Sequence, residues 1–220
     1  MPSSLVWTRR ILQLFVGQFA YGLGAALMIR ADIGLDPWDV LTQGISRRTG
    51  LSFGTLTVII GALVLLAWIP LRQRPGFGTL LNVALVGPAI DVGLAWFPSA
   101  NGWWPQALEF AAGLVVLALA SGLYIGARLG PGPRDGLMTG LHSRLGWPLW
   151  LARTLVEGTV LLVGWLLGGS VGVGTVAFAA LIGPMVGRTI PWLRVPDASS
   201  APKSPGAPAP SKTDSRSRVS

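Results

Sequence analysis

Six stretches of mostly apolar residues alternate with shorter polar segments along the chain. A helix that crosses a bilayer needs about 20 such residues, at a rise of ~1.5 Å per residue. Each of the six stretches is close to this length. We therefore predict six transmembrane helices, at residues 11–28, 51–71, 77–97, 106–127, 148–167 and 173–190.

Two segments between these spans are too polar to cross a membrane, yet both carry the signals of a short helix. The first has Asp36-Pro37 at its start and Gly50 at its end, and the second opens with the segment PGPRD (131–135) and ends near Gly146. Asp can accept hydrogen bonds from the first free N–H groups, Pro suits the first helical position, and Gly commonly follows the last turn. Each predicted helix covers about half a bilayer.

The first half of the sequence recurs in the second half at a spacing of 96 residues. Self-similarity of this kind indicates a duplicated unit. We predict a first membrane repeat (1–97), a second membrane repeat (98–195) and a disordered cytoplasmic tail (196–220) that is rich in Pro, Ser and Ala. The matching segments are IGLDPWDVL (33–41) with LGPGPRDGL (129–137), GFGT (76–79) with GVGT (172–175), and ALVGP (84–88) with ALIGP (180–184).

Three spans per repeat would place the second repeat in the opposite orientation to the first, which gives an inverted pair. If the short helices also crossed, there would be eight spans and two parallel repeats. Positive residues gather on the cytoplasmic side of membrane proteins. The six-span topology with cytoplasmic termini satisfies this rule better. It places Arg9, Arg10, Arg72, Arg74, Arg128, Arg134 and Arg144 inside with the tail, and Arg30, Arg47 and Arg48 outside.

The short helices can lie in the interface or be re-entrant, with their N-termini near the middle of the membrane. Irregular backbone is tolerated at that depth only where protein or water covers it. The Pro- and Gly-rich stretch before each helix and the half-bilayer length favour the re-entrant arrangement. Asp39 and Asp135 would then lie at two helix N-termini that face a shared central cavity.

Composition supports an integral membrane protein and argues against several other classes. Of 220 residues, 51% are hydrophobic and 12% are charged, with a mean hydropathy of +0.58, whereas soluble domains carry about 25% charged residues. The net charge of +8 comes from arginines and lysines in loops and in the tail, so we expect no nucleic-acid partner. The absence of Cys excludes disulfides and thiolate metal sites, and His142 is the only histidine.

Acidic residues inside a membrane segment are costly and mark candidate functional sites. Asp39 and Asp135 are matched by the repeat, and Asp91 and Glu157 lie within predicted spans. Each also has a plain structural interpretation. Asp39 and Asp135 can brace their own helix starts, and Asp91 can lie at the outer end of a span. Glu157 shares a helix face with Arg153, four residues earlier, and the two can neutralise each other.

Two further features bear on a binding site. Arg134 replaces Trp38 at the matching position of the second repeat, so the two halves are chemically unequal; Arg134 can bind an anionic group or simply flank the cytoplasmic surface. Gly-Pro pairs interrupt the third and sixth spans and can act as packing kinks or as hinges. They are Gly87-Pro88 and Gly183-Pro184.

The segment IGLDPWDVL, together with Gly44 and ALVGP, resembles the YczE/YyaS/YitT family of bacterial integral membrane proteins, over about residues 9–191. The resemblance implies an inner-membrane protein, and some relatives are associated with small-molecule export or with antibiotic biosynthesis. It supplies no catalytic residues. Arg134 departs from the pattern, because it occupies the Trp position of the motif.

The sequence therefore predicts an all-α inner-membrane protein that exports a small organic metabolite or drug-like compound in a proton-coupled manner. The alternative is a non-transporting accessory protein that docks or regulates a biosynthetic complex through its basic tail. We expect no enzyme, cofactor or metal site, because the chain carries no phosphate-binding loop, metal-ligand cluster or nucleophile–His–acid set. Small-residue faces such as Gly164/Gly168 and Gly183/Gly187 fit a homodimer contact and internal packing equally well.

Overall fold

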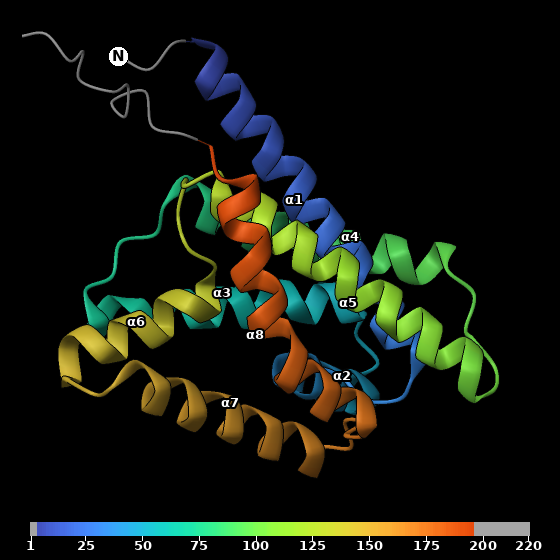
Figure 1. Ribbon diagram of the computed structural model, residues 1–220. Coiled ribbons are helices and arrows are strands. Elements are labelled where there is room, and N and C mark those ends of the chain that lie inside the picture. Colours follow the sequence, from blue (N-terminus) through green and yellow to red (C-terminus); the bar gives the residue numbers. More distant parts are fainter. Residues whose placement is uncertain (1–3, 196–220) are drawn as a thin grey trace, which may run out of the picture.

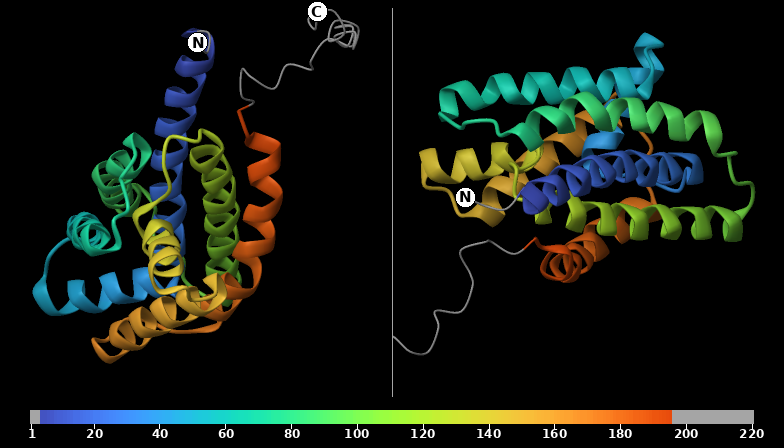
Figure 2. Two further views of the ribbon diagram at one scale, coloured as in Figure 1. Left: turned by 90° about the vertical axis from the view of Figure 1, so that its left-hand side faces the viewer. Right: turned by 90° about the horizontal axis from the view of Figure 1, so that it is seen from above.

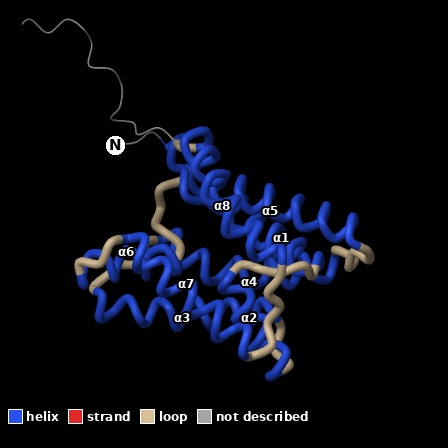
Figure 3. Tube along the Cα trace, turned by 60° about the horizontal axis from the view of Figure 1, so that its bottom comes forward, coloured by secondary structure: helices blue, strands red, loops and turns tan. Residues whose placement is uncertain are grey.

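The computed structural model describes residues 4–195, which form helices joined by short loops, with no strand in this part of the chain (Figures 1 and 3). The predicted tail, residues 196–220, lies outside the described residues. In chain order the helices are α1 (Ser4–Ala31), α2 (Pro37–Thr49), α3 (Phe53–Leu71), α4 (Phe77–Trp96), α5 (Trp103–Gly126), α6 (Pro133–Leu145), α7 (Leu149–Leu166) and α8 (Val173–Leu193).

Six of these helices are long and apolar enough to cross a membrane: α1, α3, α4, α5, α7 and α8. The prediction of six spans and two short helices is therefore confirmed. The predicted start of the first span was too late, because α1 continues through the polar turn at Trp7–Arg10. The fourth span also begins earlier than predicted, since Trp103 and Trp104 belong to α5.

The predicted ends of the two short helices are confirmed. The Asp36 carboxylate accepts hydrogen bonds from the backbone N–H groups of Trp38 and Asp39, at 2.8 and 3.0 Å, and so begins α2. Gly50 and Gly146 end α2 and α6 at φ values of 73° and 68°, the left-handed conformation that glycine adopts without strain. In contrast, Gly132 precedes α6, so no side chain caps that helix.

Five of the spans form a row, which is seen from above in Figure 2 in the order α3, α4, α1, α5, α8. The central pair, α1 and α5, packs through glycines that let the two backbones approach closely. A Cβ added at Gly24 would lie 2.9 Å from the Leu117 backbone nitrogen, and one at Gly113 would lie 2.7 Å from the Gly24 oxygen. The seventh helix, α7, lies across the row and packs against α2 and α6.

Each half of the chain holds the start of the other half's short helix. Gly78 N–H donates to the Leu129 carbonyl at 2.8 Å, and the matching Gly174 N–H donates to the Ile33 carbonyl, also at 2.8 Å. Threonine hydroxyls of the two GxGT segments reinforce these contacts. The Thr79 hydroxyl donates to the Pro131 carbonyl at 2.7 Å. In the other half, the Thr175 hydroxyl accepts from the Leu35 N–H at 3.1 Å.

The two halves differ where their last two spans meet. A Cβ added at Gly54 of α3 would lie 2.2 Å from the Gly87 oxygen of α4, so α3 and α4 are in backbone contact. Gly183 of α8, which matches Gly87, has nothing within 4 Å of an added Cβ. Among residues 4–195, α7 and α8 show no packing comparable to that of α3 and α4. The fold is therefore closed between α3 and α4 and open between α7 and α8.

The predicted Gly-Pro interruptions do not break their helices. Both α4 and α8 continue through Pro88 and Pro184. Gly87 serves the contact with α3, whereas Gly183 lines a cavity. Of the small-residue faces, Gly164 packs against α2, where an added Cβ would lie 2.4 Å from the Leu41 nitrogen.

Candidate functional site

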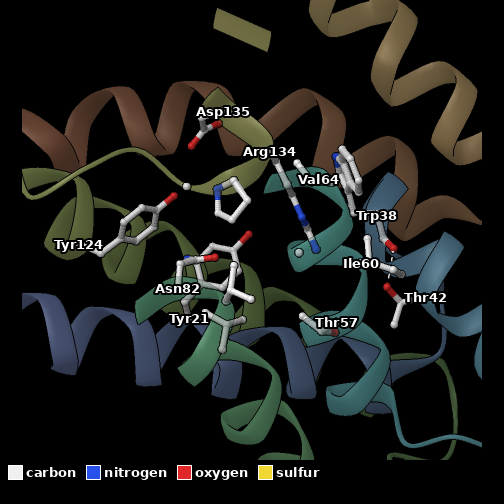
Figure 4. Close-up of a pocket in the computed structure, with 15 residues that line it drawn as sticks. Tyr21, Trp38, Thr42, Thr57, Ile60, Val64, Asn82, Tyr124, Arg134 and Asp135 are labelled. Carbon is white, nitrogen blue, oxygen red and sulfur yellow. Dashed lines mark hydrogen bonds between the residues drawn. The ribbon is translucent and has the colours of Figure 1, made fainter. Parts of the chain in front are cut away.

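Residues at matching positions of the two halves meet at the centre of the molecule. Arg134, the second residue of α6, lies over the ring of Trp38, the second residue of α2, with 5.3 Å from the guanidinium carbon to the ring centre (Figure 4). Its two terminal nitrogens each lie 3.5 Å from a carboxylate oxygen, one of Asp36 and one of Asp39. A cation of one half is thus placed among two acids and an aromatic ring of the other half.

This cluster is buried and incompletely paired. Asp36 and Asp39 are 2% and 3% exposed. Charge-assisted N–H···O bonds are usually about 2.7–2.9 Å long, so the contacts of Arg134 at 3.5 Å are loose. The second carboxylate oxygen of Asp36, Oδ2, and the indole nitrogen of Trp38 are buried with no hydrogen-bond partner among the described residues. Buried polar atoms normally have a partner, so this cluster has spare hydrogen-bonding capacity.

Two cavities lie on either side of the cluster. The smaller has a volume of about 90 Å³ and reaches α3 and α4 at Thr57 and Asn82. The larger has a volume of about 360 Å³ and opens between α5, α7 and α8, where it includes Ser121, Glu157 and Gly183. Residues that line both cavities form what we call the shared wall. These are Tyr21, Trp38, Tyr124, Arg134 and Asp135.

Aromatic rings from the two central helices complete the shared wall. Tyr21 of α1 and Tyr124 of α5 meet edge to face, with ring centres 6.0 Å apart (Figure 4). Gly132 lies close to them, because a Cβ there would lie 3.3 Å from Asp135 Oδ2 and 3.6 Å from the Tyr124 hydroxyl oxygen. The position that carries the capping Asp36 in the first half therefore has no side chain in the second half.

The predicted pairing of Arg153 with Glu157 is confirmed. Arg153 Nε lies 3.1 Å from Glu157 Oε1, and both residues line the larger cavity. Their side chains are 55% and 29% exposed, so the pair is accessible from the cavity. Asp135 also lines this cavity. The larger cavity is therefore lined by several charged side chains.

Asp91 lies apart from the other predicted site residues. Its carboxylate accepts hydrogen bonds from the Ser52 hydroxyl and from the Gly54 N–H, both at 2.7 Å. These bonds hold the first turn of α3, and Asp91 lines neither of the two cavities. These contacts give Asp91 a structural role near the end of its span, as its plain structural interpretation predicts.

Asp39 lies on α2, which is not one of the six candidate spans. Burial, together with the neighbouring Asp36 carboxylate, raises the pKa of Asp39 well above its ordinary value, and Arg134 opposes this shift. Asp39 is therefore more inclined to take up a proton than an ordinary aspartate.

Three site residues were not predicted from the sequence. Asp36 was assigned only as a helix cap, although its Oδ1 atom also contacts Arg134. Tyr21 and Tyr124 were not selected, yet they are the only tyrosines in the chain and both lie in predicted spans. Polar aromatic residues within otherwise aliphatic spans were the available signal.

Six apolar helices and a buried charged site define an integral, multi-pass membrane protein. Residues 8–191 match the family described as "Family of unknown function (DUF6198)", and the chain belongs to this family. No solved structure matches the chain.

Three relatives are similar to most of the chain, and the names of two of them agree with the predicted resemblance. An "Uncharacterized protein" of Haemophilus influenzae is 34% identical over 84% of this chain and 86% of its own length. The "Uncharacterized membrane protein YczE" of Bacillus subtilis is 32% identical over 80% of this chain and 83% of its own. The "Uncharacterized protein YyaS" of Bacillus subtilis is 26% identical over 78% of this chain and 87% of its own.

Proposed function

We propose that this protein is a secondary transporter that exports a small organic molecule across the bacterial inner membrane in exchange for protons. The observation that carries the proposal is the charged cluster of Asp36, Asp39 and Arg134 between two cavities. Burying such charges in a membrane protein is costly and is retained mainly for function. A cluster that only stabilised the fold would need neither cavity.

The difference between the halves supports an alternating-access mechanism. Contact between Gly54 and Gly87 closes the space between α3 and α4, while Gly183 leaves the matching space between α7 and α8 open. In transporters with inverted repeats, the two halves exchange conformations around a central site. Closing α7 against α8 and separating α3 from α4 would expose the cluster to the other side of the membrane.

This mechanism requires the two halves to be inverted, with re-entrant short helices and both termini in the cytoplasm. The reciprocal bonds at Gly78 and Gly174 support such an arrangement, because they fix the starts of both short helices inside the molecule. The exposed ends of these helices, Thr49 and Leu145, would then face opposite sides.

A labelling experiment tests the orientation, and the chain contains no native cysteine to interfere. Single variants Thr49→Cys and Leu145→Cys occupy matching positions of the repeat. We expect an impermeant thiol reagent to label Thr49→Cys in intact cells and Leu145→Cys only after permeabilisation. Labelling of both from the same side would show parallel halves and would rule out the proposed mechanism.

Proton coupling is tested by flux in proteoliposomes that contain a pH-sensitive dye. A concentration gradient of a transported compound should drive protons in the opposite direction across the membrane. Asp39→Asn should abolish this proton movement. Glu109→Gln is the matched control, because Glu109 of α5 lines neither cavity and bonds to the loop at Ala100. Substrate flux that ignores the pH gradient and survives both Asp39→Asn and Asp135→Asn would refute the coupling.

The accessory-protein alternative depends on the basic tail, which lies outside the described residues. Deleting residues 196–220 separates the two functions. We expect transport by the truncated chain to equal that of the full chain.

A further inference from the structure

We propose that the transported molecule is an organic cation, a protonated amine attached to a compact apolar group, and that Arg134 occupies the cation position while the carrier is empty. This inference rests on the proposed function, because it names the substrate class of the same site. It follows from three features of the cluster and of the cavities beside it: the charge balance, the aromatic surface and the unpaired polar atoms.

With its carboxylates ionised, the charge balance around the cavities is negative. Four carboxylates line the cavities or contact the cluster, and only two guanidinium groups do so. Arg153 is already paired at 3.1 Å with Glu157, so Arg134 is the guanidinium that contacts Asp36 and Asp39. Clefts lined by one sign of charge concentrate ligands of the opposite sign. The groups are Asp36, Asp39, Asp135 and Glu157, with Arg134 and Arg153.

The aromatic surface is suited to a cation. Cations bind over aromatic rings within about 6 Å of the ring centre, most strongly over Trp. The guanidinium of Arg134 is at 5.3 Å from the Trp38 ring centre. Tyr21 and Tyr124 add two rings on the other side of the wall (Figure 4). The side chain of Arg134 thus shows that a cation fits at this position.

The unpaired polar atoms show that Arg134 does not satisfy the site. Asp36 is 2% exposed, and its Oδ2 atom has no hydrogen-bond donor among the described residues. The residue nevertheless lines the larger cavity. An ammonium group carries N–H donors on a single compact nitrogen, so it can hydrogen-bond to such an oxygen. The loose contacts of Arg134, at 3.5 Å, can be exchanged for shorter ones to a ligand.

An anionic substrate fits the same geometry poorly. An anion bound to Arg134 would have to displace Asp36 and Asp39 and then remain beside both buried carboxylates and Asp135. Like charges at such distances repel strongly where little water screens them. The Arg134 guanidinium cannot compensate at once for Asp36, Asp39 and an added anion.

The experiment uses three small probes that share a benzene ring and differ in charge: benzylammonium, benzyl alcohol and benzoate. Binding to the purified full-length chain at neutral pH is measured from the concentration dependence of the unfolding temperature, since a ligand that binds the folded state stabilises it. We expect benzylammonium to bind at least about tenfold tighter than the other two probes. Binding that is tightest for benzoate, or equal for all three, would overturn the proposal.

Two variants test the role of each charge. Asp39→Asn should weaken benzylammonium binding about tenfold, and Arg134→Gln should strengthen it by a similar factor because the internal competitor is removed. Neither should change the binding of benzyl alcohol, and Glu109→Gln should leave all three probes unaffected. If Arg134→Gln weakens benzylammonium binding, the arginine does not compete with the ligand and that part of the proposal is wrong. If Arg134→Gln does not fold, the charge series on the wild type and Asp39→Asn still decide the substrate class.

The outcomes separate this inference from the proposed function. Charge-selective binding without proton-coupled flux would support the cation site and refute the transporter. Proton-coupled flux of neutral or anionic compounds, without preference for benzylammonium, would support the transporter and refute the cation site.

Discussion

Replacing Gly136 by alanine should push α6 away from α3 and destabilise the chain. A Cβ at Gly136 would lie 1.9 Å from Cζ2 and 2.3 Å from Cη2 of Trp68. Ordinary carbon–carbon contacts are about 3.5–4.0 Å. The two helices would therefore have to separate by well over an ångström, or the indole would have to leave its site.

The indole of Trp68 has little freedom to move. Trp68 is 2% exposed, and its Nε1–H donates a hydrogen bond to the Pro133 carbonyl at 3.1 Å, next to Arg134. Overpacking a core costs about 1–3 kcal/mol, and an orphaned buried donor costs a similar amount. The greater helix propensity of alanine returns only about 1 kcal/mol. We expect a net destabilisation of about 2 kcal/mol for Gly136→Ala.

The assay is the free energy of unfolding of the full-length chain in detergent micelles, followed by circular dichroism. Gly158→Ala on α7 is the matched control, because a Cβ there meets nothing within 4 Å. Without a clash, it should gain up to about 1 kcal/mol from the greater helix propensity of alanine. Trp68→Phe removes the clashing atoms, so the double variant Gly136→Ala/Trp68→Phe should be at least about 1 kcal/mol more stable than the sum of the single effects. Equal stability of Gly136→Ala and Gly158→Ala, or no rescue by Trp68→Phe, would refute this reasoning.

Three further predictions concern the cluster and its supports. Asp36→Ala should cost about 1 kcal/mol of stability through loss of the α2 cap, whereas Asp36→Asn, also a good cap, should retain most of it in the same unfolding assay. Because burial raises the pKa of Asp39, its contribution to stability is fully present below the ordinary value of 3.8 and is lost as pH rises through the raised pKa. Wild-type stability relative to Asp39→Asn should therefore fall in a titration from about pH 4 to pH 8, and a rise would contradict the shift. Thr79→Val should cost about 1–2 kcal/mol, because the Thr79 hydroxyl that bonds to the Pro131 carbonyl is fully buried; an unchanged unfolding curve would contradict this.

Local features of the sequence were sufficient to predict the helices. Span length follows from hydrophobicity, and the ends of α2 and α6 follow from Asp36, Gly50 and Gly146, whose effects act within one turn. The start of α1 was missed because a helix already formed can continue through a polar turn such as Trp7–Arg10. Hydrophobicity indicates which residues lie within the membrane, but it does not show where the backbone hydrogen bonds of a helix end.

The site could be predicted only in part. The repeat selected Asp39 and Asp135, because duplication marks equivalent positions without knowledge of contacts. The contact between Asp36 and Arg134 joins residues 98 positions apart, and no local pattern encodes it. In the same way, the depth of Asp91 in its span was evident, whereas its hydrogen bonds to Ser52 and Gly54 depend on how α3 packs against α4.

The reciprocal anchoring of the short helices has a consequence for biosynthesis. The Thr79 hydroxyl that holds the start of α6 is made before its partner Pro131, so α6 can dock as soon as it is synthesised. The start of α2 must instead wait for Thr175, which follows its partner Leu35 by 140 residues. Because α2 is made early and anchored late, its start would lack this anchor in a nascent chain that stalls before its final span. Arrest before α8 would thus yield a chain that has entered the membrane with its central acids still unanchored, the form that quality-control proteases would meet.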